Sequence, residues 1–188
     1  MNKVDLDNIE KNLKNIIDIL VKNKDRREEL EDTPQKIAES YLDIFSGIEK
    51  NPREEFKTKH KTEKKDLIIE RGIDFYSMCE HHFLPFFGTI DIAYVPNGTI
   101  VGFGAIIRVV ETLSRRPQIQ ERLTSEIADV IFEELECSGV MVIAKGRHTC
   151  MKMIGTKKIN SSIVTTSCRG IFETDNNKKM EVLAFIEK

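Results

Sequence analysis

The sequence changes character at Asp66, and this change constrains the fold more than any other feature. Residues 66–78 (DLIIERGIDFYSM) and 86–96 (FFGTIDIAYVP) are rich in β-branched and aromatic residues, and a Pro-Asn-Gly turn at 96–98 leads into TIVGFG. Segments 140–155 and 162–172 are also expected to form strands. We therefore predict antiparallel strand pairs over most of the chain beyond residue 65.

Apolar residues at helical spacing predict helices over 5–24, 106–116, 118–135 and 176–188. Another helix is expected to begin near Thr33, with Asp32 or Thr33 as its cap and Pro34 in its first turn. Segment 22–32 is expected to be a charged connector. The highly charged segment 49–65 is expected to be a mobile loop. The predicted division is 1–65, a helical region with a charged loop, and 66–188, an α+β domain with helices packed on one side of an antiparallel sheet.

Length and charge exclude several classes of protein. The chain has 188 residues and a net charge of −2, so it has no general attraction to nucleic acid or to an anionic membrane surface. No apolar run approaches the ~18–20 residues that span a bilayer. The N-terminal residues lack the apolar core of a signal peptide, and a cytoplasmic location is expected.

Two short motifs concentrate metal-binding side chains. Cys79, His81 and His82 lie in CEHH, while His148 and Cys150 lie in RHTC. One turn can present both residues of a C-x-x-H motif, and two residues at i and i+2 of a strand share a face. Thiolate and imidazole ligands suit tetrahedral Zn²⁺. In a reducing compartment, metal ligation is a better explanation of these cysteines than disulfides.

The five candidate ligands leave three interpretations open. The grouping could be a coincidence of buried thiols, or a structural zinc with four protein ligands. A catalytic zinc would use three protein ligands and keep one position for water. Two histidines would then remain as acid/base groups beside the ion, and this surplus favours catalysis.

Longer motifs carry a resemblance to a known family. They are DTPQKIAESYLDIFSG, FYSMCEHHFLPFFG, RRPQIQERLT, HTCMKM and VTTSCRGIF. From about Asp32 to the C-terminus the chain resembles GTP cyclohydrolase I. The resemblance implies the tunnelling fold, in which sheets of many subunits join into a ring-shaped barrel. It also implies a homo-oligomer, typically a decamer, with active sites between subunits.

The resemblance also implies a reaction and a set of roles. The family hydrolyses the imidazole ring of GTP at C8, releases formate and forms dihydroneopterin triphosphate. The matching positions are Cys79, His82 and Cys150 as zinc ligands, His148 as the acid/base at N7 and C8, His81 in ribose opening, Glu121 at the guanine edge, Gln120 at the ribose, and Arg108 at the phosphates. Without the resemblance, Gln120 and Glu121 would be interpreted as a solvated first helical turn.

The sequence departs from the family where the triphosphate is held. Gly104 and Ala105 replace a serine and a lysine, and Ile154 replaces an arginine. The arginine and lysine of the family's T-P-x-R-V-A-K motif are Lys36 and Glu39 here. Hydrogen bonds to charged groups contribute ~1.5–3 kcal/mol each, so the losses predict weak binding of a triphosphate. The remaining positive candidates are Arg108, Lys157, Lys158 and Arg169.

Three functions therefore remain open. The first is a zinc-dependent cyclohydrolase that opens the imidazole ring of GTP, or of a guanine-type purine with fewer phosphates or none. The second is a zinc-stabilised purine-binding or regulatory protein without turnover. The third is a purely structural oligomer. Formate release separates the first from the others, and purine binding separates the second from the third.

Overall fold

The computed structural model describes residues 3–154 and 159–186. The chain divides into two compact units, Met1–Ser46 and Gly47–Lys188. The domain division expected after residue 65 stays a prediction. Lys157 and Lys158, two of the positive candidates for a phosphate site, lie outside the described residues.

The described part of the first unit contains three helices, α1 (Lys3–Leu20), α2 (Lys24–Glu29) and α3 (Thr33–Ile44), and α1 packs against α3. Helix α3 begins where the Thr-Pro pair predicts, although the Asp32 side chain makes no capping hydrogen bond. Helix α2 lies in the expected connector. It forms because the Asn23 side chain accepts a hydrogen bond from the Arg26 amide at 3.1 Å and so caps its first turn.

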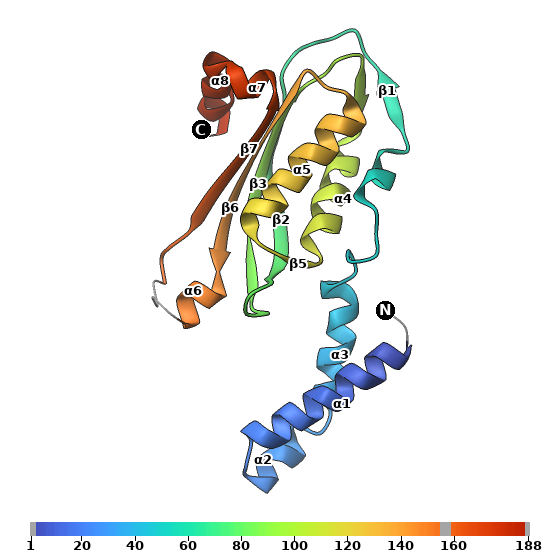
Figure 1. Ribbon diagram of the computed structural model, residues 1–188, viewed down its shortest axis with the longest axis vertical. Coiled ribbons are helices and arrows are strands. Elements are labelled where there is room, and N and C mark those ends of the chain that lie inside the picture. Colours follow the sequence, from blue (N-terminus) through green and yellow to red (C-terminus); the bar gives the residue numbers. More distant parts are fainter. Residues whose placement is uncertain (1–2, 155–158, 187–188) are drawn as a thin grey trace. The chain divides into compact units, whose positions relative to one another are not determined.

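The second unit is built on a five-stranded sheet (Figure 1). Its strands lie in the order β5 (Pro117–Gln118), β2 (Ile68–Cys79), β3 (Pro85–Val95), β6 (Gly139–His148) and β7 (Ile163–Gly170). Only the short β5 pairs in parallel within this sheet; the other neighbours are antiparallel, as the sequence predicts. A separate antiparallel pair joins β1 (Lys59–Lys61) to β4 (Thr99–Val101).

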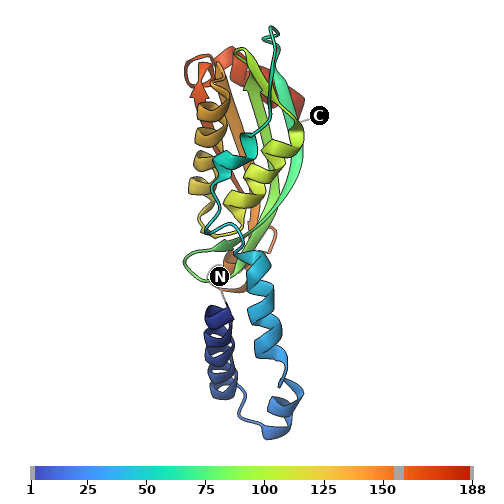
Figure 2. The same cartoon turned by 90° about the vertical axis from the view of Figure 1, so that its right-hand side faces the viewer.

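Helices cover both faces of this sheet (Figure 2). Helices α4 (Phe103–Ser114) and α5 (Gln120–Leu135) enclose the main core on one face. Helices α7 (Ile171–Thr174) and α8 (Asn176–Ile186) bury Phe172 and Val182 against Ala93 and Met141 on the other. The α+β class is confirmed, but packing of all helices on one side is wrong. Part of the sheet is apolar on both faces, and each face needs a cover.

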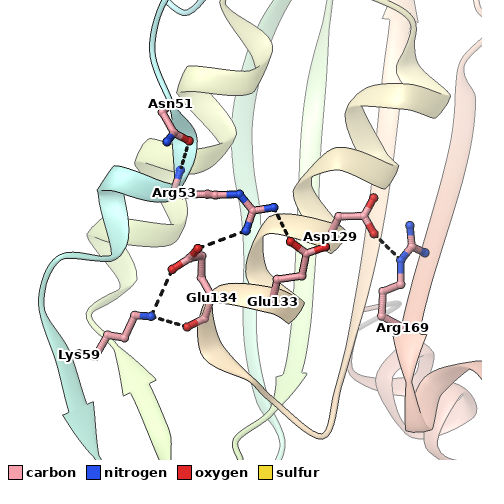
Figure 3. A network of polar contacts seen from close by, with 7 residues as sticks. All are labelled: Asn51, Arg53, Lys59, Asp129, Glu133, Glu134 and Arg169. Carbon is pink, nitrogen blue, oxygen red and sulfur yellow. Dashed lines mark hydrogen bonds and ion pairs between the residues drawn. The ribbon is translucent and has the colours of Figure 1, made fainter.

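The predicted mobile loop at 49–65 is wrong, because this segment is anchored to α5 (Figure 3). It contains the 3₁₀ helix η1 (Pro52–Phe56) as well as β1, and Phe56 is only 3% exposed. Arg53 forms ion pairs with Glu133 and Glu134 of α5. The Lys59 Nζ atom lies 3.2 Å from a carboxylate oxygen of Glu134. Arg53 and Lys59, two of the charges that suggested a solvated loop, therefore have partners far along the sequence.

No helix within residues 3–154 and 159–186 has both the length and the apolar character that a membrane span requires.

A carboxyl group is partly buried in β2 away from the CEHH motif. The register between β2 and β3 shifts just after Glu70, and the Oε2 atom of Glu70 is buried without a hydrogen-bond partner. Burial raises the pKa of Glu70 to about 7. Burial likewise raises the pKa of Tyr94 to about 12. A charged Glu70 therefore destabilises the fold.

We expect Glu70→Gln to stabilise the protein at pH 8 and to have little effect at pH 5. The folded-state pKa of Glu70 lies above the ordinary value of 4.5, so the folded protein holds this proton more tightly than the unfolded chain. The stability that protonated Glu70 provides is therefore lost as pH rises towards 7. Allowing for partial exposure, the gain at pH 8 should be roughly 1–3 kcal/mol. Urea unfolding at both pH values and one protein concentration measures it. The exposed Glu63→Gln serves as control, and an equal gain at both pH values would contradict the prediction.

Candidate metal centre and active site

A tight turn presents the CEHH motif at the end of β2. The Cys79 amide donates to the Leu84 carbonyl at 2.9 Å, and the Phe83 amide donates back to the Cys79 carbonyl at 2.9 Å. Phe83 has a φ of 50°, in the left-handed region, which allows the chain to reverse into β3. Cys79 consequently stays buried while His81 and His82 are exposed.

The second motif lies where β6 ends. Strand β6 stops at His148, and the short helix α6 (Thr149–Met153) follows at once. The prediction that His148 and Cys150 share one face of a strand is therefore wrong, because Cys150 belongs to a helical turn. The hydroxyl of Thr149 donates to the Pro85 carbonyl at 2.5 Å and joins α6 to the start of β3. This contact brings the two motifs together.

Three of the five candidate ligands form one group. Ligand atoms of Cys79, His82 and Cys150 all lie within 4.8 Å of one another, and Cys79 Sγ is 3.9 Å from His82 Nδ1. Zn–S and Zn–N bonds at a tetrahedral angle place S and N about 3.6 Å apart. Burial and the neighbouring Cys79 thiol raise the pKa of Cys150, and a divalent cation would offset both effects. The donor set and its spacing fit zinc.

Cys79, Cys137, Cys150 and Cys168 are free thiols in the structure.

His148 lies outside the group of three and is held by other contacts. The ring is 9% exposed and stacks on Phe86 with centroids 4.5 Å apart. Its Nε2 atom is 2.9 Å from Gln120 Oε1. Burial lowers the pKa of His148, and the nearby Glu121 carboxylate opposes that effect. The ring can exchange a proton without serving as a fourth ligand.

His81 is also outside the group and points into solvent. Its side chain is 65% exposed, and its Nε2 atom lies 3.8 Å from Glu80 Oε1. Glu80 in turn pairs with Arg122 of α5 at 2.5 Å, and Arg122 Nε donates to Gln118 Oε1 at 2.8 Å. The Glu80–Arg122 pair was not predicted. Glu80 was visible inside CEHH, but nothing in the sequence indicates its partner.

The predicted substrate residues lie at two different places. Gln120 is the first residue of α5 and is buried, whereas the adjacent Glu121 is exposed. Arg108 lies on α4 and lines a cavity of about 380 Å³. The other lining residues are Glu54, Glu55, Lys57, Thr58, His60, Gly102, Gly104 and Ala105.

The positive charge of Arg108 is already paired in this cavity. Its Nε atom lies 2.6 Å from Glu55 Oε2. Arg169, another positive candidate, donates to Asp129 at 2.6 Å and to Ser125 at 2.8 Å, and is therefore fixed to α5. Two of the cations that could replace the missing phosphate contacts are thus engaged within the chain.

We expect one zinc ion per chain, retained in His81→Ala and His148→Ala and lost in Cys79→Ala and Cys150→Ala. The two thiols belong to the group of three, whereas the two other histidines do not. Metal content per chain by mass spectrometry after dialysis measures this. Loss of the ion in the His148 or His81 variant would indicate a fourth protein ligand and a closed structural site.

Comparisons with known proteins show which family this chain resembles along its length. The family model described as GTP cyclohydrolase I matches residues 9–187. The protein named GTP cyclohydrolase 1 from Fusobacterium nucleatum is 56% identical over 86% of this chain and 86% of its own length. The Clostridium perfringens protein of that name is 45% identical over 97% of this chain and 98% of its own. Similarity to the solved archaeosine synthase QueF-Like is weak, with a TM-score of 0.41 and 15% identity over 58% of this chain and 97% of that chain. The family match and the identities establish that this chain belongs to the GTP cyclohydrolase I family.

Proposed function

We propose that this protein is a zinc-dependent cyclohydrolase that opens the imidazole ring of a guanine-type purine at C8 and releases formate. The observation that carries the proposal is the gathering of Cys79, His82 and Cys150 with His148 left outside the group. Three ligands leave one coordination position for water, and a separate buried imidazole is available for proton transfer. Family membership and the relatives' shared name, GTP cyclohydrolase 1, support the same reaction.

The protein groups have separable tasks in this reaction. Cys79, His82 and Cys150 would hold the zinc ion, which would supply hydroxide near neutral pH. His148 delivers a proton to the ring nitrogen so that the C–N bond can break, and His81 assists opening of the ribose. Glu121, exposed in the first turn of α5, accepts hydrogen bonds from the guanine edge. Gln120 is proposed to contact the ribose.

We further propose that the preferred purine carries fewer phosphates than GTP. Gly104 and Ala105 line the α4 cavity without charge, and Arg108 is neutralised there by Glu55. Glu54 adds a second carboxylate to the same cavity. A polyanion would have to displace an existing ion pair and approach a further negative charge.

The positions of the cavity and the metal centre support assembly into a homo-oligomer. Within the sheet unit, the metal centre lies beside the start of β3, while α4 begins towards the opposite end of the sheet (Figure 1). Helix α4 has 12 residues, a length of ~18 Å, and it separates the two places. We propose that a neighbouring chain supplies the cavity and that the chains form a ring, typically a decamer in this family.

The function is tested by incubating the zinc-loaded protein with guanine, guanosine, GMP and GTP and measuring formate. We expect release from at least one of them. His148→Ala and His81→Ala should reduce the rate by ~10²–10⁴-fold, the usual effect of losing a positioned acid or base.

Zinc content and thermal unfolding of each variant are the controls, because an unfolded or metal-free variant would lose activity for another reason. Purine binding without formate release would favour the purine-binding alternative. Full activity in either histidine variant would remove that residue from the mechanism.

For substrate choice, we expect guanosine or GMP to bind more tightly than GTP in the unaltered protein. Ala105→Lys combined with Ile154→Arg should improve GTP binding by at least about tenfold, the equivalent of one charged hydrogen bond. Calorimetry with the zinc-loaded protein measures this, and an unchanged affinity for guanosine is the control. A micromolar Michaelis constant for GTP in the unaltered protein would contradict the prediction.

A further inference from the structure

The side-chain amide of Gln120 has only one chemically sensible orientation. The residue is 1% exposed, and its Nε2 atom lies 3.0 Å from the Ala144 carbonyl oxygen, 3.0 Å from that of Ile163 and 3.1 Å from Thr165 Oγ1. Backbone carbonyls only accept hydrogen bonds, so the NH₂ group must face them. The opposite orientation would place the amide oxygen against two carbonyl oxygens. Gln120 Oε1 therefore faces His148.

This orientation determines which nitrogen of His148 carries a proton. Gln120 Oε1 has no hydrogen, so the 2.9 Å contact with His148 Nε2 requires that Nε2 donates. Within the described residues this is the one hydrogen bond found for the ring. Nδ1 is then the nitrogen that is free to accept a proton. The two ring nitrogens are thus assigned different tasks by one neighbour.

Two contacts together fix the ring itself. Phe86, fully buried in the core, stacks on the imidazole at an interplanar angle of 7° and so sets its plane. Stacking alone allows the ring to flip within that plane, which would exchange the two nitrogen-bearing edges. The hydrogen bond to Gln120 excludes the flipped state, because it requires Nε2 at one edge.

The surroundings of Gln120 are shaped to hold its amide in place. A Cβ atom on Gly146 would lie 2.1 Å from Gln120 Oε1, so only glycine leaves room for the amide over β6. Thr124 donates to the Gln120 carbonyl at 2.7 Å, and its contact with Thr165 at 2.6 Å is therefore donated by Thr165. The Thr165 oxygen remains available to accept from the Gln120 amide.

From this network we propose that Gln120 is a positioning residue that holds His148 with its proton on Nε2 and keeps Nδ1 for proton exchange with substrate. The role goes beyond the contact with ribose that the resemblance implies for Gln120. Its catalytic meaning depends on the proposed function, whereas the position of the proton does not.

The position of the proton is measured directly by solid-state NMR of zinc-loaded protein labelled with ¹⁵N-histidine, at pH 8. The chain has four histidines, and the His148 signals are identified as those missing from His148→Ala. We expect a directly bonded proton on Nε2 and none on Nδ1. A proton on Nδ1 would overturn the proposal, whether or not the protein releases formate.

A matched pair of variants tests the role of the amide. Gln120→Met keeps the volume but removes the acceptor, and we expect the ordered Nε2–H signal of His148 to be lost. Gln118→Met removes another fully buried glutamine amide, one that contacts Leu113, Arg122 and Glu126 rather than a histidine. It should leave the His148 signals unchanged. An unchanged signal in Gln120→Met would overturn the proposal.

Kinetics separate positioning from substrate contact in the zinc-loaded Gln120→Met protein. Misplacement of an acid/base group can cost about 10²-fold in rate, so we expect kcat to fall by up to that factor with KM nearly constant. A rise in KM at constant kcat would instead assign Gln120 to ribose binding alone.

Gly146→Ala provides an independent check if Gln120→Met fails to fold. It leaves the glutamine in place but forces Oε1 away from its present position. The same loss of the Nε2–H signal is expected. Retention of that signal in a folded Gly146→Ala protein would contradict the proposal.

Discussion

The register of three antiparallel strands is the constraint on which the candidate site depends. Ser77 of β2, Phe86 of β3 and His148 of β6 lie side by side in the sheet. This alignment places the turn after β2 next to the helix after β6, and so brings Cys79 and Cys150 together. A slip of one residue would turn Phe86 to the opposite face and remove the stacking surface for His148. The chemistry at this end of the sheet thus follows from backbone pairing.

Much of this arrangement could be predicted, because it depends on local sequence. A C-x-x-H motif can be presented by one turn, and apolar periodicity locates α4 and α5. The predictions failed where partners are distant along the chain. Segment 49–65 is rich in charge, and only the structure shows that Arg53 pairs with α5. Gln120 resembled a solvated first helical turn, yet strands β6 and β7 supply its acceptors.

The structure also shows why a count of basic residues does not describe an anion site. Arg108 and Arg169 both remain in the sequence, but Glu55 and Asp129 already pair with them. A guanidinium held in an ion pair must lose that partner before it can bind phosphate, and the lost pair offsets part of the new attraction. We therefore expect substrate preference in this protein to depend on its acidic residues as well as on its basic ones.

Strand β7 connects a free edge of the sheet to the residues that hold Gln120. It is the last strand in the five-stranded order, so its outer edge presents backbone groups that can pair with another chain. Its inner side supplies the Ile163 carbonyl and the Thr165 hydroxyl that hold Gln120. A chain that pairs along this edge would stiffen the backbone on which the His148 contact rests. We therefore expect assembly and the fixed orientation of His148 to be thermodynamically linked. Dilution should lower the fraction of assembled chains and the fraction of correctly oriented His148 together.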